Sequence, residues 1–101
     1  MIARHRDRVG AIHVKDVFPD YLDPVAREGV SYFAAQASKR LWAEPGYGVV
    51  DFDAVIAAMP DDYDGDYMIE VDEPSIDDRF ESVRRSHEWA VRSLHARGVI
   101  R

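Results

Sequence analysis

The fold is decided by the stretch GAIHVKDV, residues 10–17. It is short and rich in β-branched side chains, and Phe18-Pro19-Asp20 ends it, so it predicts a strand over residues 9–17. A second strand is predicted over residues 66–72, after a turn at residues 61–65. Helical patterns separate and follow the two strands. Strands that alternate with helices pair in parallel through right-handed crossovers, which predicts an α/β fold with parallel strands.

Two helical patterns lie between the strands. Residues 25–42 are helical in tendency, with an interruption at residues 29–31. Residues 44–48, EPGYG, predict a loop. Asp51 is predicted to cap a second helix, because apolar residues follow it at helical spacing until Pro60 ends the pattern.

The last helix is predicted over residues 78–97, with Gly98 as its C-terminal stop. One apolar stripe runs along it and is expected to face the core. The stripe consists of Phe80, Val83, His87, Ala90, Val91 and Leu94. On this pattern His87 is expected to be a packed histidine. Trp42 and Trp89 are also expected to pack, with contact to a ligand as the alternative for Trp42.

The composition limits the classes of protein that the chain represents. With 101 residues it forms one domain with a modest core, and the lack of cysteine excludes disulfides, thiolate metal sites and thiol nucleophiles. The formal charge of −6 argues against a nucleic-acid partner, which needs a basic surface. No apolar run is long enough to span a membrane and no secretory signal is visible. We therefore expect a cytoplasmic protein without a membrane partner.

Each predicted strand carries ionisable groups on one face, near its C-terminal end. His13 and Lys15 share a face of the first strand, and Glu70 and Asp72 share a face of the second. The enzymes of this fold class place their chemistry at this end of parallel strands. Taken singly, each residue is more often structural, as a hydrogen-bonded histidine, a surface lysine or a solvated carboxylate. Taken together, His13 and Glu70 on consecutive parallel strands indicate a metal site.

Three blocks of sequence resemble a known family. They are GAIHVKDV at residues 10–17, EPGYGVVDF at residues 44–52 and YDGDYMIEVD at residues 63–72. In this order they resemble the C-terminal portion of the xylose isomerase-like TIM barrels, the sugar phosphate isomerases and epimerases, and above all the inosose dehydratase-like branch. The insert at residues 19–43 also suits that branch. The resemblance implies the C-terminal two strand–helix units of a TIM (β/α)8 barrel, so that residues 1–101 are a single partial domain of a fold of about 250 residues.

The resemblance also implies roles for individual residues. His13 and Glu70 correspond to metal ligands on the seventh and eighth barrel strands, and Glu70 is also the catalytic group that moves a proton. The implied substrate-binding positions are Lys15, Pro45, Gly46 and Gly48. The family's metal shell contains a further Glu and Asp, which are expected on strands that precede this part of the barrel.

The implied cofactor is a divalent metal, Mn²⁺, Co²⁺ or Mg²⁺, which suits one imidazole combined with carboxylates. In the family such a metal holds adjacent hydroxyl and carbonyl oxygens of a sugar or cyclitol and stabilises the enediolate that forms when a proton leaves. Isomerisation, epimerisation and dehydration all follow from that step, and the sequence leaves the three open. The chain is expected to be inactive alone, and to act as an enzyme only when a complementing chain supplies the missing barrel strands.

Two other interpretations stay open. The chain fits a small non-enzymatic α/β module that self-associates, as a homo-oligomer, to cover its exposed strand edges. The related metal-dependent DNA endonuclease barrels fit less well, because the acidic charge suits a sugar site better than a DNA groove.

Overall fold

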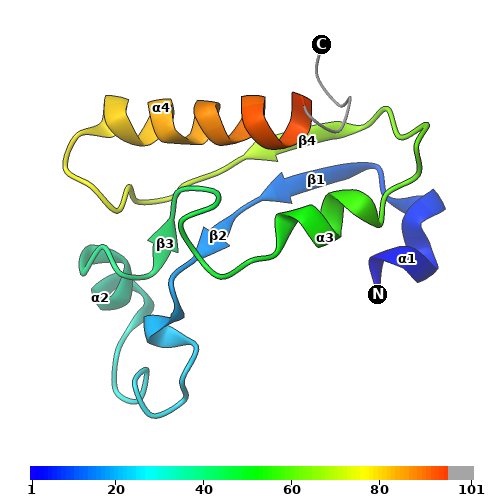
Figure 1. Ribbon diagram of the computed structural model, residues 1–101. Coiled ribbons are helices and arrows are strands. Elements are labelled where there is room, and N and C mark those ends of the chain that lie inside the picture. The colour runs from blue at the N-terminus through cyan, green and yellow to red at the C-terminus, as the bar shows by residue number, and fades with distance from the viewer. Residues whose placement is uncertain (96–101) are drawn as a thin grey trace.

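The computed structural model describes residues 1–95 and shows a mixed α/β chain (Figure 1). Its elements in chain order are α1 (Ile2–His5), η1 (Arg6–Arg8), β1 (Ala11–Val14), β2 (Asp16–Val17), η2 (Pro19–Tyr21), α2 (Tyr32–Ala37), β3 (Trp42–Ala43), α3 (Phe52–Ala57), β4 (Asp66–Ile69), α4 (Arg79–Ala90) and the π-helical η3 (Val91–His95). The predicted alternation of strands and helices is confirmed.

β1 and β4 pair in parallel, as the alternation predicts, with His13 opposite Met68 and Val14 opposite Ile69. The amide of Glu70 donates to the carbonyl of Val14 at 3.1 Å, so the ladder continues one residue beyond β4. The predicted strand over residues 9–17 is wrong in one respect. It breaks at Lys15, and β2 turns away to pair antiparallel with β3.

The segment at residues 25–42 differs most from its predicted helix. Only Tyr32–Ala37 is helical, and Ser31 caps it by accepting from the amide of Ala34 at 3.1 Å. Left-handed backbone at Gly29 (φ 71°) and Lys39 (φ 60°) interrupts the helical conformation on both sides of α2. Trp42 and Ala43 form β3 instead, because β2 offers them a strand edge. The helical tendency of the segment is overridden by this long-range pairing.

One face of the parallel pair is covered by helices. Val14 packs there with Phe52 and Ile56 of α3 and with Trp89 of α4, and the Phe52 and Trp89 rings meet edge to face at 5.2 Å. The predicted N-cap of α3 is confirmed, since Asp51 accepts from the amide of Ala54 at 3.0 Å. The opposite face of the pair carries His13 and Met68, and neither residue belongs to the core cluster.

The predicted apolar stripe of the last helix is wrong. Phe80 is 88% exposed and Val83 is 68% exposed, whereas Ser82, Ser86 and Trp89 are buried. The serine hydroxyls explain the rotation of the helix: Ser82 donates to Glu44 at 2.7 Å, so the helix presents small polar residues to the chain beneath it.

His87 is exposed as well, so the expectation of a packed histidine is wrong, while the buried Trp89 is a packing residue as predicted. Of the predicted stripe, Leu94 is buried and Ala90 packs against the core. The predicted helix stop at Gly98 lies outside the described residues.

Candidate functional site

The ionisable residues of the two parallel strands meet at the C-terminal end of the pair. His13 Nδ1 lies 2.9 Å from Glu70 Oε2, and Lys15 Nζ lies 3.1 Å from Glu70 Oε1. Lys15 Nζ also donates to Asp72 Oδ2 at 2.7 Å. The register explains this convergence: His13 faces Met68, so Glu70 is two residues further along on the same face. Three of the residues proposed from the sequence, His13, Lys15 and Glu70, therefore come together.

His13 and Glu70 supply two adjacent donors of the kind that Mn²⁺, Co²⁺ or Mg²⁺ accepts. Their side chains are 57% and 38% exposed, so both are open to further ligands. Within residues 1–95, however, no group of three or more His, Cys, Asp or Glu residues is arranged to hold a metal ion. Among the described residues the candidate ligands are therefore limited to this pair.

Lys15 is fixed in place by its neighbours. Its ammonium bridges Asp72 and Glu70 and lies 4.2 Å from the ring centre of Trp42, in cation–π contact. The hydrogen bond to Asp72 raises the pKa of Lys15 above its ordinary value, with Glu70 acting in the same direction and partial burial opposing it. The same bond lowers the pKa of Asp72, with a smaller contribution from the hydroxyl of Tyr32. The ammonium is therefore a positive charge that is held beside Glu70 and His13.

Three residues of this cluster were not among the site residues predicted from the sequence. Asp72 carries a signal in the sequence, because it follows Glu70 by two residues and so shares its face. Trp42 carries a weaker one, since it precedes the EPGYG loop. Tyr32 carries none. Its hydroxyl reaches Asp72 Oδ2 at 3.2 Å only because residues 18–43 fold back toward β4.

The loop at residues 44–50 is held by Asp16, a fully buried carboxylate that the sequence analysis did not single out. Asp16 accepts hydrogen bonds from the backbone amides of Gly46, Gly48 and Val50 at 3.0, 2.9 and 3.1 Å. Gly48 has no room for a side chain, since a Cβ there would lie 2.3 Å from Asp16 Oδ1 and from the carbonyl oxygen of Val17. The loop is thus pinned to the start of β2.

The predicted substrate-binding residues of this loop contact other parts of the structure. Pro45 is fully buried, and a Cβ at Gly46 would meet the ring of Trp89 at 2.8 Å. In the part of the chain that the structure describes, no hydrogen bond joins Pro45, Gly46 or Gly48 to His13 or Glu70. Their substrate-binding role stays a prediction.

Glu44 is a second buried carboxylate, and it ties three segments together. It accepts from the amide of Ser75 at 3.1 Å, from the Ser75 hydroxyl, and from the Ser82 hydroxyl at 2.7 Å. Burial alone would raise the pKa of Glu44, but the hydrogen bonds from Ser75 and Ser82 hold it below its ordinary value. The EPGYG loop, the segment after β4 and α4 are joined through this one side chain.

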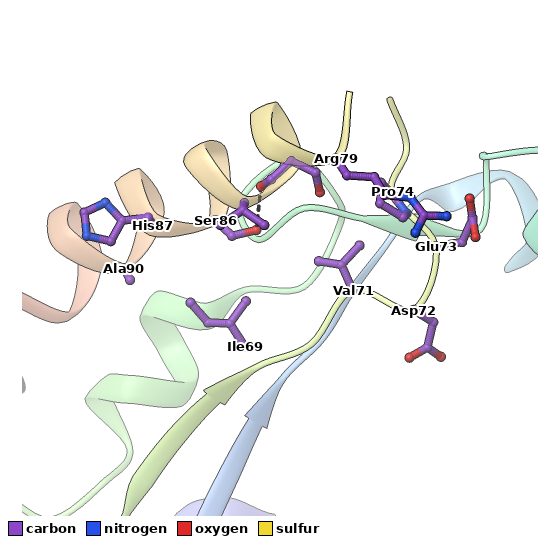
Figure 2. Close-up of a pocket in the computed structure, with 11 residues that line it drawn as sticks. Ile69, Val71, Asp72, Glu73, Pro74, Arg79, Ser86, His87 and Ala90 are labelled. Atoms are coloured by element: carbon purple, nitrogen blue, oxygen red, sulfur yellow. Dashed lines mark hydrogen bonds between the residues drawn. The ribbon is translucent and has the colours of Figure 1, made fainter. Parts of the chain in front are cut away.

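A cavity of about 550 Å³ lies between β4 and α4 rather than at the His13 cluster (Figure 2). Ile69 and Val71 extend into it toward α4, whereas Asp72 extends away from α4. Most of its other lining comes from α4, including Val83 and Ala90. His13 and Glu70 are not among the residues that line this cavity, and its lining is mainly apolar.

Among residues 1–95, no helix has both the length and the apolar character needed to cross a bilayer.

Curated proteins similar to this chain are named inosose dehydratase. The relative from Klebsiella pneumoniae (strain 342) is 29% identical over 91 residues, which cover 88% of this chain and 30% of the relative. The relative from Geobacillus kaustophilus is 28% identical over 97 residues, which cover 94% of this chain and 31% of the relative.

No protein-family model and no solved structure matches the chain. The chain spans about 30% of the length of the curated relatives that it matches. The similarity extends over nearly the whole of this chain, and it agrees with a portion of a protein from the xylose isomerase-like family.

Proposed function

We propose that this chain is the C-terminal part of a divalent-metal-dependent enzyme of the xylose isomerase-like TIM barrel family, acting on a sugar or cyclitol. The observation that carries the proposal is the approach of His13 Nδ1 to within 2.9 Å of Glu70 Oε2 at the C-terminal ends of adjacent parallel strands. The similarity to proteins named inosose dehydratase supports the same substrate class. The name of these relatives favours dehydration among the three outcomes.

His13 and Glu70 are the residues that would hold the metal. When bound, the metal supplies Lewis acidity to adjacent hydroxyl and carbonyl oxygens of the substrate. Glu70 has one carboxylate oxygen on the side of Lys15, and in this proposal Glu70 takes the proton from the carbon beside the carbonyl. In a dehydration that proton and a hydroxide from the next carbon leave together as water.

Lys15 has a complementary task. Its ammonium is held beside Glu70 by Asp72 and Trp42, so it can donate a hydrogen bond to a substrate oxygen that gains negative charge. Because the charge is positioned before the ligand arrives, little reorganisation is needed when the proton moves.

The chain supplies only part of this machinery. Two strands form a poor parallel sheet. Among residues 1–95, neither β1 nor β4 pairs with a third strand at its outer edge, and the short β2–β3 pair is a separate sheet. The polar face with His13 and Met68 is uncovered, as the lining of a barrel is when the remaining strands are removed. We propose that the missing ligands and strands come from a polypeptide that completes the barrel.

A chimera tests the proposal. The chain replaces the matching 30% of the Klebsiella pneumoniae relative, and dehydration of an inosose is followed with Mn²⁺ or Co²⁺ present. We expect activity that Glu70→Gln reduces by about a hundredfold or more, as for loss of a positioned acid–base group. The matched control Glu73→Gln changes a neighbouring carboxylate outside the cluster. A chimera whose activity is insensitive to Glu70→Gln would refute the assignment.

A second candidate, a self-associating module without enzymatic activity, is favoured by one observation. Phe80 and Val83 are exposed on α4 beside the apolar cavity, and an apolar surface of this kind marks an interaction site. Sedimentation equilibrium separates the two. A stable oligomer that neither binds Mn²⁺ nor changes with His13→Ala would favour the module.

A further inference from the structure

The excursion at residues 18–43 returns to the site rather than extending into solvent. The amide of Phe18 donates to the carbonyl of Leu41 at 3.0 Å, and β2 pairs with β3 beyond it, so both ends of the excursion are fixed together. Tyr32 and Trp42 lie near its middle and its end. Their rings meet edge to face with centres 6.4 Å apart, which joins α2 to β3.

Both aromatic residues reach the charged cluster. The Tyr32 hydroxyl donates to Asp72 Oδ2 at 3.2 Å, and the Lys15 ammonium lies 4.2 Å from the centre of the Trp42 ring. Lys15 donates to the same Asp72 oxygen at 2.7 Å. Tyr32 and Trp42, which both belong to the excursion, thus contact Asp72 and Lys15, the two charged residues next to the His13–Glu70 pair.

This group is accessible, which separates it from the buried carboxylates that only support loops. The side chains of Lys15 and Asp72 are 28% and 26% exposed, and Tyr32 is 51% exposed. Ion pairs this exposed contribute little to stability. Both hydrogen bonds that end on Asp72 among the described residues use Oδ2, which leaves Oδ1 to accept from a ligand.

We infer that Lys15, Asp72 and Tyr32 form a hydroxyl-binding subsite beside the metal position, and that Trp42 is a positioning residue that holds Lys15 in it. The inference rests on the proposed function and adds the recognition of the ligand. An ammonium donates, a carboxylate accepts and a phenol does both, so the three groups match neighbouring hydroxyls of a polyhydroxylated ring. The excursion then determines which ring hydroxyls are accepted.

The test uses the full 101-residue chain with myo-inositol as the probe, followed by amide chemical shifts and with cyclohexanol as a ligand that has a single hydroxyl. We expect shifts centred on residues 32, 42 and 72 with myo-inositol only. Tyr32→Phe should weaken binding about fivefold, as expected for one hydrogen bond. The matched variant Tyr63→Phe, which removes a hydroxyl that donates to the carbonyl of Asp66, should leave binding unchanged.

A double-mutant cycle tests the positioning role of Trp42. Lys15→Met should weaken myo-inositol binding about fivefold or more in the wild-type background and less than twofold in Trp42→Leu, because the lysine is no longer held. Additive losses would overturn this role. Absence of myo-inositol binding, or binding indifferent to Tyr32→Phe, would overturn the subsite.

A different measurement, the binding of Mn²⁺, tests the proposed metal function separately from the subsite. We expect broadening of amide signals by Mn²⁺ to depend on His13 and Glu70, and neither is changed in the variants above. If Mn²⁺ broadening is absent while myo-inositol still shifts residues 32, 42 and 72, the subsite stands and the metal assignment falls. If Mn²⁺ binds and myo-inositol does not, the subsite falls and the metal assignment stands.

Discussion

At the residue scale, the charged side chains divide into an exposed group and a buried group. His13 and Glu70 face outward and have spare coordination capacity, whereas Asp16 and Glu44 are fully buried and engaged by hydrogen bonds. No buried side-chain nitrogen or oxygen among residues 1–95 lacks a hydrogen-bond partner. The buried carboxylates therefore support the loops, and the exposed ones are available for chemistry.

Asp16 is expected to make a large contribution to stability. Its two carboxylate oxygens accept from four backbone amides, those of Val17 and of three loop residues. Asp16→Asn replaces one acceptor by a donor facing those amides, which should lower the free energy of unfolding by about 2 kcal/mol. Urea denaturation measures the change, with the exposed Asp64→Asn as control. Equal stability of the two variants would contradict the role.

The lowered pKa of Glu44 makes the free energy of unfolding depend on pH. Its pKa is held below the ordinary value of 4.5, so it contributes stability at pH above 4.5 that is lost as the pH falls through the folded-state pKa. We expect the free energy of unfolding of Glu44→Gln to fall less steeply below pH 4.5 than that of the wild type. Denaturation curves across that range provide the measurement, and parallel curves would exclude the effect.

Much of the site follows from the sequence at this scale, and the rest does not. Strand alternation places His13, Lys15, Glu70 and Asp72 on one face of the pair, because period-two geometry is local. Tyr32 and Asp16 could not be assigned this way. Their partners are 40 residues away for Tyr32 and 30 for the Asp16–Gly46 bond, and such contacts depend on how the chain folds back.

At the element scale, strong local signals predict the structure and weak ones do not. The Asp51 cap starts α3, and β1 and β4 fall within the two predicted strands. The segment at residues 25–42 has helical propensity, yet Trp42 and Ala43 pair with β2. In α4 the buried face is set by the bond from Ser82 to Glu44, which outweighs the apolar stripe with Phe80.

The loop at residues 44–50 yields a prediction with an internal control. Gly48→Ala places a Cβ 2.3 Å from the carbonyl oxygen of Val17, a backbone atom that cannot move without disturbing β2. We expect a loss of about 2 kcal/mol or more in the free energy of unfolding. Gly10→Ala, where no atom lies within 4 Å of the added Cβ, should change it by less than about 0.5 kcal/mol. Similar losses in both variants would contradict this packing.

At the scale of the whole molecule, the described chain is thin and open. Its principal extents are 44, 32 and 17 Å, and its radius of gyration of 14.9 Å exceeds the roughly 13 Å typical of a compact domain of about 100 residues. The core cluster joins Val14 of β1 to Phe52 and Ile56 of α3 and to Trp89 of α4. This open shape agrees with the similarity to relatives about three times as long, of which the chain covers about 30%.

The exposed surface of α4 gives a prediction at this scale. Phe80 is 88% exposed, so Phe80→Ser should change the free energy of unfolding of the isolated chain by less than about 0.5 kcal/mol. We expect the same variant to weaken assembly with a separately produced remainder of the Klebsiella pneumoniae relative, measured by sedimentation velocity. The exposed Arg92→Ser serves as control. A large loss of stability without an effect on assembly would show that Phe80 belongs to the core of this chain.

We propose that His13 and Glu70 are two adjacent ligands of a divalent metal, and Mn²⁺-induced broadening of amide NMR signals tests this most directly. We expect broadening centred on residues 11–15 and 66–72 of the isolated chain, weak because only two ligands are present, and lost in His13→Ala while the exposed His87→Ala retains it. Broadening spread over the acidic surface, or localised broadening that His13→Ala leaves unchanged, would contradict the claim.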